Sequence, residues 1–582
     1  MVTFIWIIAL AVIGTLIFLS WRNNGLKHTK TKATGDGQMG SARWATHSEL
    51  QEAFKCVEYR PDLWRNGECL PEEQGIIVHC EPENESSGRL SAIRDRVSRR
   101  GGEDDPILNC YIDDDDVHML LIGASGIGKT ANFLYPNIEY AFAAGMSFIT
   151  TDTKGDLYRY TGTIGEKYYG YKIRVIDLRN PLQSSGYNMI YLINKYMDAW
   201  KVSGKSSDLA KAEKYAKITS KTIIEMGVDP GAFGQNSFFY DSAEGIVTAT
   251  LLLVAQYANK GERHIVSVFK LIQDLMSPSN APGKNQFQVL IDFLPEDNRA
   301  RFYAAAALKS AGETMASVMS TAMSRLLTFI DAELEQIMCF QNSIDVEDFC
   351  ESPTAIYIVL PEEDTTKYFL AGLFIQQMYR EMLMVADRKG GKLDNRVMFY
   401  CDELGTMPKI DGLEAMFSAA RSRKISIVAI IQSLSQFKQK YGEEGAEIIQ
   451  DNCQLTLFGG FAPNSTTAEV LAKNLGNQTI ENESVTYGGE MRGFRMAQSR
   501  QISMTQRQLI TTDELKNMPK GHFILMKTGW HPFKTRLKLF LKWGISFEEQ
   551  YYIEEKNQRV AKYANKNRLF DAVIDSNPAI AS

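Results

Sequence analysis

The sequence has no cationic excess. Lysine and arginine together number 64 against 70 aspartate and glutamate residues, which gives a formal net charge of −6. Bulk charge therefore offers no argument for binding nucleic acid, and any such contact has to come from local basic patches or from a pore formed on assembly. The chain also lacks internal repeats, and its 44% hydrophobic and 23% charged residues indicate a globular rather than a disordered protein.

Cysteine is sparse and never occurs as a CxxC pair. The eight residues stand in different local settings: Cys56, Cys69, Cys80, Cys110, Cys339, Cys350, Cys401 and Cys453. This usage indicates reduced thiols in a cytosolic body rather than a disulfide framework. A zinc site built from Cys69, His79 and Cys80 stays open as an alternative.

Charge is missing altogether from Val2 to Trp21, a run long enough to cross a bilayer as a helix. A cleaved signal peptide would carry basic residues before the apolar run, whereas here they follow it: Arg22, Lys27, Lys30 and Lys32. We therefore predict an uncleaved single-pass anchor in the cell membrane. The positive-inside rule then leaves the N-terminus outside and the body in the cytoplasm.

The length of 582 residues predicts two to four domains. Short apolar runs bounded by turn residues predict parallel strands at 117–122, 146–151, 172–177, 355–360, 397–401, 425–431 and 454–458. The expected architecture is α/β. Its predicted parts are the anchor (1–21), a polar tether with a small irregular or β element (22–110), the sheet domain in two parts (111–190 and 345–545), an inserted all-α domain (191–344) and a charged tail (546–582).

A glycine-rich loop follows the first of these strands. The residues are Gly123, Ala124, Ser125, Gly126, Ile127, Gly128, Lys129 and Thr130, with the spacing of a Walker A loop. Consecutive backbone N–H groups in such a loop point at one anion, with Lys129 placed for the β- and γ-phosphates and Thr130 for Mg²⁺. The alternative is a glycine-rich turn with a surface lysine.

A carboxylate pair follows a later strand. Asp402 and Glu403 end the apolar run 397–401. Asp402 is placed to orient the water molecules around Mg²⁺, and Glu403 to polarise the attacking water. An acidic pair in this position also caps helices, so that interpretation stays open.

The strand 425–431 carries polar groups at both ends. Gln432 leaves its carboxyl end, where ligands bind in open α/β sheets, and could sense the γ-phosphate; it could equally be an ordinary polar residue. Arg421, Arg423 and Lys424 precede the strand, away from the phosphates of their own subunit. Such a cluster is commonly a solvated face, but in a ring an arginine there can reach a neighbour's nucleotide.

The motifs taken together resemble those of the coupling proteins of type IV secretion and conjugation, the TraG/TraD-like ATPases. The resemblance rests on "GSARWAT", "GASGIGKT", "DTKGDL", "CDELG", "ARSRKISIVAIIQS", "FGGFAPNSTTAEVLAKNLGNQT" and "LITTDELKNMPKGHFIL", in this order. It covers most of the chain.

This resemblance implies a RecA-like motor domain with an all-α domain, assembled as a homo-hexamer at the membrane, that binds ATP and Mg²⁺. It implies single-stranded DNA with its relaxase and the secretion channel as partners. Lys129 and Thr130 then bind nucleotide and Mg²⁺, Asp402 and Glu403 form Walker B, Gln432 is the sensor, and Arg421 is the finger acting in trans.

The sequence departs from the family at two points. Many relatives have two membrane spans, whereas one is predicted here. The more usual "DPKGEL" reads "DTKGDL", which weakens any role for Lys154. In the all-α domain a basic stretch could contact phosphates or could be a solvated helix with internal ion pairs. Its lysines are Lys201, Lys205, Lys211, Lys214, Lys217 and Lys221.

Two other functions remain open on the sequence alone. One is a nucleotide-switched receptor that docks relaxase-bound DNA without being the motor. The other is a DNA translocase of the FtsK/HerA type, against which the single short anchor and the family-like segments argue.

Overall fold

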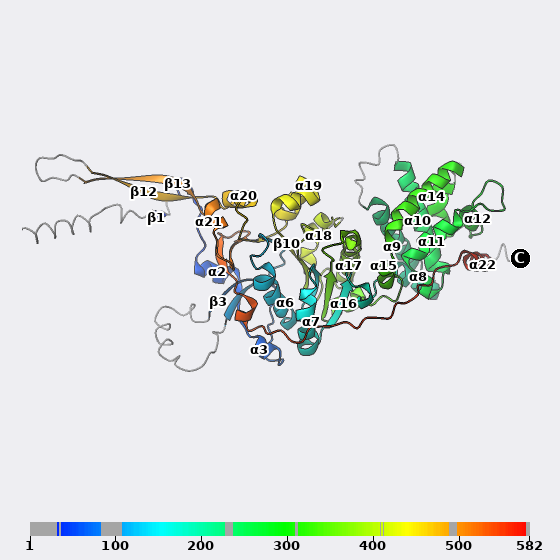
Figure 1. The fold of residues 1–582 in the computed structure, drawn as a ribbon, viewed down its shortest axis with the longest axis horizontal. Helices are drawn as coiled ribbons and strands as arrows, with labels where there is room; N and C mark the ends of the chain where they lie inside the picture. Colours follow the sequence, from blue (N-terminus) through cyan, green and yellow to red (C-terminus); the bar gives the residue numbers. More distant parts are fainter. Residues whose placement is uncertain are drawn as a thin grey trace, which may run out of the picture.

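The structure is a computed structural model that describes residues 32–33, 37–82, 108–226, 237–308, 312–407, 409–410, 412–487 and 498–577. The predicted membrane span lies outside these residues and stays a prediction. The described chain is elongated, with a long hairpin at one end, a sheet with flanking helices in the middle and a bundle of helices at the other end (Figure 1).

A nine-stranded sheet forms the centre of the molecule, in the order β15-β14-β11-β5-β10-β9-β6-β8-β7. From β11 to β7 every pair of neighbours is parallel, and β14 and β15 add an antiparallel edge. The parallel strands are β5 (Met119–Ile122), β6 (Ser147–Asp152), β7 (Lys172–Asp177), β8 (Thr354–Val359), β9 (Val397–Cys401), β10 (Ile425–Ile431) and β11 (Leu455–Phe458). Strands thus form at all seven predicted places, whereas β14 (His522–Lys527) and β15 (Phe533–Arg536) were not predicted.

Both faces of this sheet are covered, as expected for a parallel sheet with continuous apolar strands. In β10, Val428 and Ile430 join the core beneath α6 (Tyr135–Ala143) and α7 (Asp156–Tyr169). Ile427, Ala429 and Ile431 point the other way. They join the core beneath α17 (Tyr368–Arg388), α18 (Leu413–Ala419), α19 (Leu434–Asp451) and α20 (Thr466–Asn474). Alternation along one strand therefore serves two apolar layers.

A small sheet packs beside the antiparallel edge of the large one. It contains β2 (Lys55–Tyr59), β3 (Ile76–Pro82) and β4 (Leu108–Asp113) in the order β2-β4-β3, with α2 (His47–Ala53) and α3 (Pro61–Trp64) nearby. The ring Nδ1 of His79 lies 2.9 Å from Thr535 Oγ1, and the Cys80 thiol donates to the Arg536 carbonyl. Cys69 is exposed. Within the described residues no three His, Cys, Asp or Glu side chains are grouped for a metal, so the zinc alternative has no support.

Helices alone occupy the described part of the chain between β7 and β8, apart from short turns. They are α8 (Tyr191–Ser203), α9 (Ser206–Glu225), α10 (Ser237–Tyr257), α11 (Ile265–Leu275), α12 (Gln286–Asp292), α13 (Arg299–Leu308), α14 (Gly312–Leu326), α15 (Ala332–Met338) and α16 (Val346–Glu351). In length and composition α10 alone among the described helices could cross a membrane, but 67% of its apolar window is buried inside the bundle. It therefore fits the core helix of this bundle.

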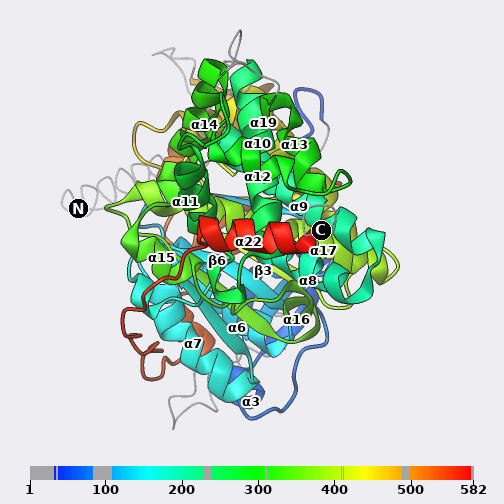
Figure 2. The same cartoon turned by 90° about the vertical axis from the view of Figure 1, so that its right-hand side faces the viewer.

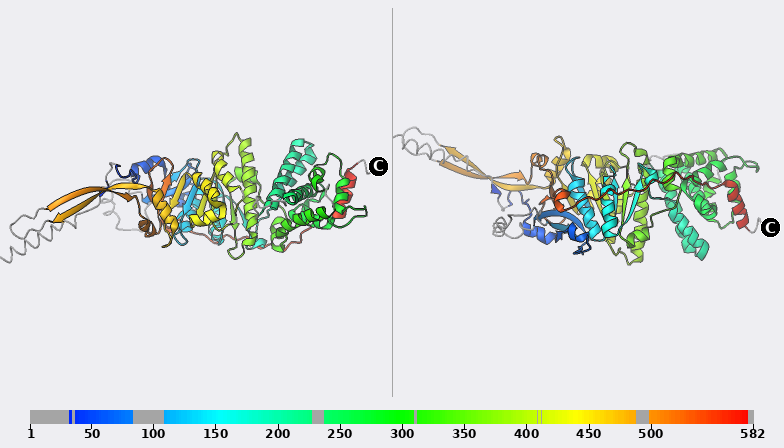
Figure 3. Two further views of the ribbon diagram at one scale, coloured as in Figure 1. Left: turned by 90° about the horizontal axis from the view of Figure 1, so that it is seen from above. Right: turned by 60° about the horizontal axis from the view of Figure 1, so that its bottom comes forward.

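A long hairpin projects from the opposite end of the molecule (Figure 3). Its strands are β12 (Asn477–Tyr487) and β13 (Gln498–Gln508), and the short β1 (Lys32–Ala33) pairs with β12. This pairing places Lys32 and Ala33 beside the base of the hairpin.

A segment after the last strand connects the sheet domain to the helical bundle. We call residues 546–565 the C-terminal strap; it runs along the sheet domain and leads to α22 (Lys566–Ser576), which lies across the helical bundle (Figure 2). The Tyr551 N–H donates to the Arg159 carbonyl in α7 (2.7 Å). Further along, Gln336 of α15 exchanges two hydrogen bonds with the backbone of Arg559 (2.9 and 3.1 Å). The tail that the sequence left uninterpreted is therefore an ordered link.

The link ends in an apolar anchor. In α22, Leu569 and Val573 are buried in the bundle core, and α22 contacts α10 and α11. Arg568 on the same helix forms an ion pair with Glu262 (2.7 Å). Apolar burial fixes the end of the strap, while hydrogen bonds fix its course.

We predict that Val573→Asp releases α22, since an unpaired carboxylate in place of a side chain with 0% exposure costs several kcal/mol. Hydrogen exchange in residues 549–564 should rise at least tenfold. Asn567→Asp adds the same charge to an exposed site on the same helix and should leave exchange unchanged. Unchanged exchange in Val573→Asp would show that the strap is held without α22.

Candidate nucleotide site

The glycine-rich loop connects β5 to η2 (Lys129–Leu134), which continues into α6. Gly128 has a φ of 95°, in the left-handed region that favours glycine. At Gly123 a Cβ atom would lie 2.1 Å from the Ile127 side chain and 2.8 Å from the Gly459 carbonyl oxygen. The loop therefore needs glycine at these two positions for different reasons, one conformational and one steric.

Lys129 is folded back onto its own loop. Its Nζ donates to the carbonyls of Gly123 (2.8 Å) and Ala124 (3.3 Å), and the side chain is 7% exposed. Burial lowers the pKa of the ammonium, and the nearby carboxylates of Asp402 and Glu403 oppose that shift. A loop with a buried, charged lysine has the chemistry for a phosphate, and the reading as a turn with a surface lysine is wrong.

The carboxylate pair lies directly across from this loop. Ser125, Gly126, Gly128, Lys129 and Thr130 share one cavity of about 310 Å³ with Asp402 and Glu403. Strand order explains the meeting, because β5 and β9 are both parallel neighbours of β10. Gly123 and Ala124 lie behind the cavity as acceptors for Lys129.

Asp402 is the most perturbed acid of the site. Burial first, and then the charge of Glu403, raise its pKa to about 7. Its side chain accepts one described hydrogen bond, from the Glu403 N–H (3.0 Å). Neither residue caps a helix, since turns follow them and α18 begins after its own N-cap, Gly412. The helix-cap alternative is therefore wrong.

Glu403 is held in an unusual conformation. Its φ of 54° lies in the left-handed region, which costs free energy for a residue with a side chain. Its Oε1 accepts a hydrogen bond from Gln432 Nε2 (3.3 Å). Gln432 thus contacts Glu403 without lining the cavity itself, and its role as a sensor stays a prediction.

Residues 152–157 at the end of β6 form the third wall of the cavity. The sequence analysis noted this segment as a motif but did not assign it to the site. Asp152 is buried, and burial raises its pKa to about 6. Its carboxylate accepts from the N–H groups of Lys154 (3.3 Å), Gly155 (2.8 Å) and Tyr158 (3.2 Å). The signal was present in the sequence, because an aspartate ends β6 just as Asp402 follows β9.

Arg421 lies at the amino-terminal ends of the parallel strands, opposite the ends that form the phosphate cavity. It begins η8 (Arg421–Arg423), which precedes β10, whereas Gln432 follows that strand. Arg423 pairs with Asp387, and Lys424 donates to the Asp394 carbonyl. Arg421 is exposed and has no ion pair to any residue that the structure describes. It contributes nothing to the phosphate cavity of its own chain.

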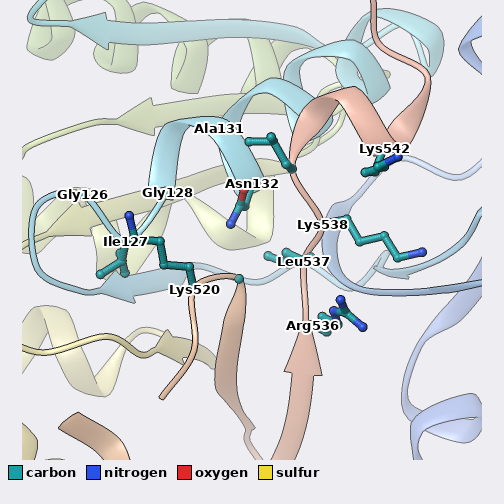
Figure 4. A pocket seen from close by; sticks show the side chains of 12 residues that line it. Gly126, Ile127, Gly128, Ala131, Asn132, Lys520, Arg536, Leu537, Lys538 and Lys542 are labelled. Atoms are coloured by element: carbon teal, nitrogen blue, oxygen red, sulfur yellow. The ribbon is translucent and has the colours of Figure 1, made fainter. Parts of the chain in front are cut away.

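A second cavity of about 640 Å³ lies on the other side of the glycine-rich loop (Figure 4). It shares Gly126, Gly128 and Ala131 with the first cavity and also contains Ile127. Its other lining residues are Asn132, Lys520, Gly521, Arg536, Leu537, Lys538, Leu539 and Lys542. The wall combines apolar and cationic side chains with no carboxylate.

The basic stretch of the helical bundle is largely engaged within the chain. Lys201 donates to the Ala255 carbonyl at the end of α10 (3.4 Å), and Lys221 pairs with Glu225 (3.6 Å). Lys211 and Lys214 lie over the rings of Tyr196 and Tyr215. These contacts favour a solvated helix with internal pairs over a phosphate-contacting face.

We predict that Asp402→Asn stabilises the protein in Mg²⁺-free buffer, and more so at pH 8 than at pH 5. The folded state keeps the Asp402 proton up to about pH 7, whereas an unperturbed aspartate loses it near 3.8. Between these values the folded state binds more protons, so it loses stability as pH rises, by a few kcal/mol at most. Urea unfolding measures this, with exposed Asp571→Asn as control. An equal gain in the free energy of unfolding at both pH values would contradict the raised pKa of Asp402.

Comparison with known proteins extends these observations over most of the chain. The family described as "Type IV secretory system Conjugative DNA transfer" matches residues 86–568. The "Type IV secretion system-coupling protein VirD4" of Bartonella quintana is 21% identical over 544 residues, covering 93% of this chain and 78% of that protein. Its namesake from Bartonella henselae is 21% identical over 468 residues, covering 79% and 68%.

Solved structures show the same fold. The unbound conjugative coupling protein TrwBdeltaN70 superposes with a TM-score of 0.52 at 14% identity, covering 92% of this chain and all of that one. TrwB in complex with ADP and Mg²⁺ superposes with a TM-score of 0.50, covering 82% and 97%. The described chain thus shares the fold of these solved coupling proteins. The match to the family model covers well over half of the chain, so the chain belongs to the type IV secretory system conjugative DNA transfer family.

Proposed function

We propose that this chain is a membrane-anchored, hexameric ATPase that couples relaxase-bound DNA to a type IV secretion channel and powers or gates its transfer. The observation that carries this is the phosphate cavity, in which Lys129 and Thr130 face Asp402 and Glu403. A P-loop facing a strand-end carboxylate pair is the arrangement that hydrolyses nucleoside triphosphates. Membership of the conjugative DNA transfer family supplies the substrate class.

The residues present fit Mg²⁺ and ATP. The Asp402 carboxylate has a free oxygen for a metal-bound water, and the Thr130 hydroxyl lines the same cavity. Mg²⁺, when bound, would neutralise charge on the phosphates. The loop N–H groups and Lys129 hold the phosphates, Glu403 polarises water, and Gln432 fixes the Glu403 carboxylate. The structural neighbour crystallised with ADP and Mg²⁺ supports this assignment.

The second cavity accommodates the nucleoside. Because the two cavities share Gly126, Gly128 and Ala131, phosphates in one lead the ribose and base into the other. Ile127 and Leu537 offer apolar surface for a base there. The lining has donors and no carboxylate, so it suits the acceptor atoms that adenine and guanine both carry.

The exposed Arg421 favours a ring. It is too far from its own nucleotide, at the other edge of the sheet, and it is not engaged in an ion pair with the described residues. In a hexamer this edge faces the phosphate cavity of the next subunit, where an arginine raises the rate by roughly 10³ to 10⁵ in other NTPases.

Chain connectivity supports a membrane-facing end of the molecule in this proposal. Residues 1–21 form the anchor in this proposal, with the N-terminus outside and the body in the cytoplasm. Pairing of β1 with β12 then directs the hairpin toward the bilayer and the channel. The helical bundle at the far end faces the cytoplasm, where relaxase-bound single-stranded DNA arrives.

We predict that Lys129→Ala abolishes ATP hydrolysis and DNA transfer while the protein stays membrane-bound. Glu403→Gln should bind ATP normally and hydrolyse it at least a hundredfold more slowly, because the carboxylate acts on water rather than in binding. Full-length protein in detergent, with and without single-stranded DNA, serves for both assays. Near-normal hydrolysis in Lys129→Ala would refute the ATPase. If the parent protein transfers DNA but its rate of ATP hydrolysis does not rise when single-stranded DNA is added, the nucleotide-switched receptor is favoured.

A mixing experiment tests the finger. Arg421→Ala and Lys129→Ala should each be inactive alone, but an equal mixture restores roughly a quarter of the interfaces if Arg421 acts in trans. Glu403→Gln mixed with Lys129→Ala should restore nothing, because both lesions fall on the same side of the shared site. No recovery in the first mixture, with co-assembly confirmed by differential tags, would overturn the role of Arg421.

A further inference from the structure

The third wall of the phosphate cavity contains a cation without an assigned role. Lys154 lines the cavity together with Lys129, Thr130, Asp402 and Glu403. Its side chain is exposed, and no residue that the structure describes forms an ion pair with it. Lys129 approaches from the loop after β5, whereas Lys154 approaches from the loop after β6 on the far side of Asp402.

The backbone of this loop is fixed from below. The Asp152 carboxylate accepts the N–H groups of Lys154 and Gly155, and Gly155 takes the left-handed φ of 77° that the turn needs. These hydrogen bonds define the shape of the loop, and they leave the Thr153 and Lys154 carbonyls to other donors.

The same loop is fixed from behind by an arginine at the end of β7. Arg179 donates to the carbonyls of Thr153 (2.7 Å) and Lys154 (3.1 Å), and to the carbonyl of Leu360 after β8 (3.5 Å). A guanidinium presents several donors in one plane, which suits three carbonyls from two segments. With the backbone held on both sides, only the Lys154 side chain is left to move toward the cavity.

We propose that Lys154 binds the terminal phosphate of the nucleoside triphosphate and that Arg179 is the residue that positions its loop. The proposal rests on the ATPase function above. The lysine side chain is exposed, and it gains a charge-assisted hydrogen bond when a third phosphate extends past Thr130 toward the carboxylates. Such a contact distinguishes a triphosphate from a diphosphate.

The test is the ratio of affinities for a non-hydrolysable ATP analogue and for ADP, measured with the full-length protein in detergent. Lys154→Ala should lower the affinity for the analogue about tenfold or more and leave the affinity for ADP within about twofold. It should also lower kcat. Lys154→Arg should keep most of the selectivity because it keeps the charge. Lys473→Ala, at an exposed site at the end of α20, is the matched control and should change neither affinity.

Arg179 is tested through Lys154. Arg179→Ala should reduce the same selectivity, whereas the double variant with Lys154→Ala should be no less selective than Lys154→Ala alone, because both changes remove one contact. Additive losses would show a separate role for Arg179 and overturn its assignment as a positioning residue.

Two further outcomes would overturn the role of Lys154. If Lys154→Ala lowers the affinities for the analogue and for ADP equally, Lys154 does not bind the terminal phosphate. Parental selectivity in Lys154→Ala, with Lys129→Ala inactive, would make it a surface lysine while leaving the ATPase assignment standing. If the parent protein binds neither nucleotide, the proposed function fails first.

Discussion

Parallel pairing of four strands is the constraint on which the site depends. The pairs Ile122 with Ile431, Ala429 with Cys401, and Thr150 with Tyr400 align β5, β10, β9 and β6 in one direction and nearly one register. The residues that follow each strand therefore lie together at the carboxyl ends of the strands. The phosphate loop, Gln432, the carboxylate pair and the 152–155 loop meet there, although up to some 300 residues of sequence separate them.

The site is electrostatically unbalanced without its ligands. Four acids line one small cavity, and they face two lysines, of which Lys129 is bound to its own loop. The acids are Asp152, Asp156, Asp402 and Glu403. Burial raises the pKa of Asp152 and of Asp402, and Glu403 has a strained backbone. A divalent cation would compensate the negative charge of the carboxylates, and bound phosphates would compensate the positive charge of Lys129. The apolar layers on both faces of the sheet supply the packing that keeps this arrangement folded.

The sequence predicted what periodicity and local motifs encode. The strands of the parallel sheet, the phosphate loop, Asp402 with Glu403, and Gln432 all follow from apolar runs and the residues that end them. Other features depend on distant partners. Arg179 matters through carbonyl groups of Thr153 and Lys154, which leave no trace in residue types. The edge strand β15 has four residues whose buried and exposed side chains alternate, and β14 has an apolar centre that the sequence analysis left unassigned. The strap has no period because its hydrogen bonds use the backbone.

The strap changes how the helical bundle can move. The bundle is inserted between β7 and β8, so two neighbouring peptide connections join it to the sheet domain. Two such connections define an axis about which the bundle could swing. The strap crosses from the far edge of the sheet, and α22 grips the bundle at a third point away from that axis. A body held at three points cannot rotate about that axis unless the contacts of the strap or of α22 break, so the strap restrains the orientation of the bundle relative to the sheet.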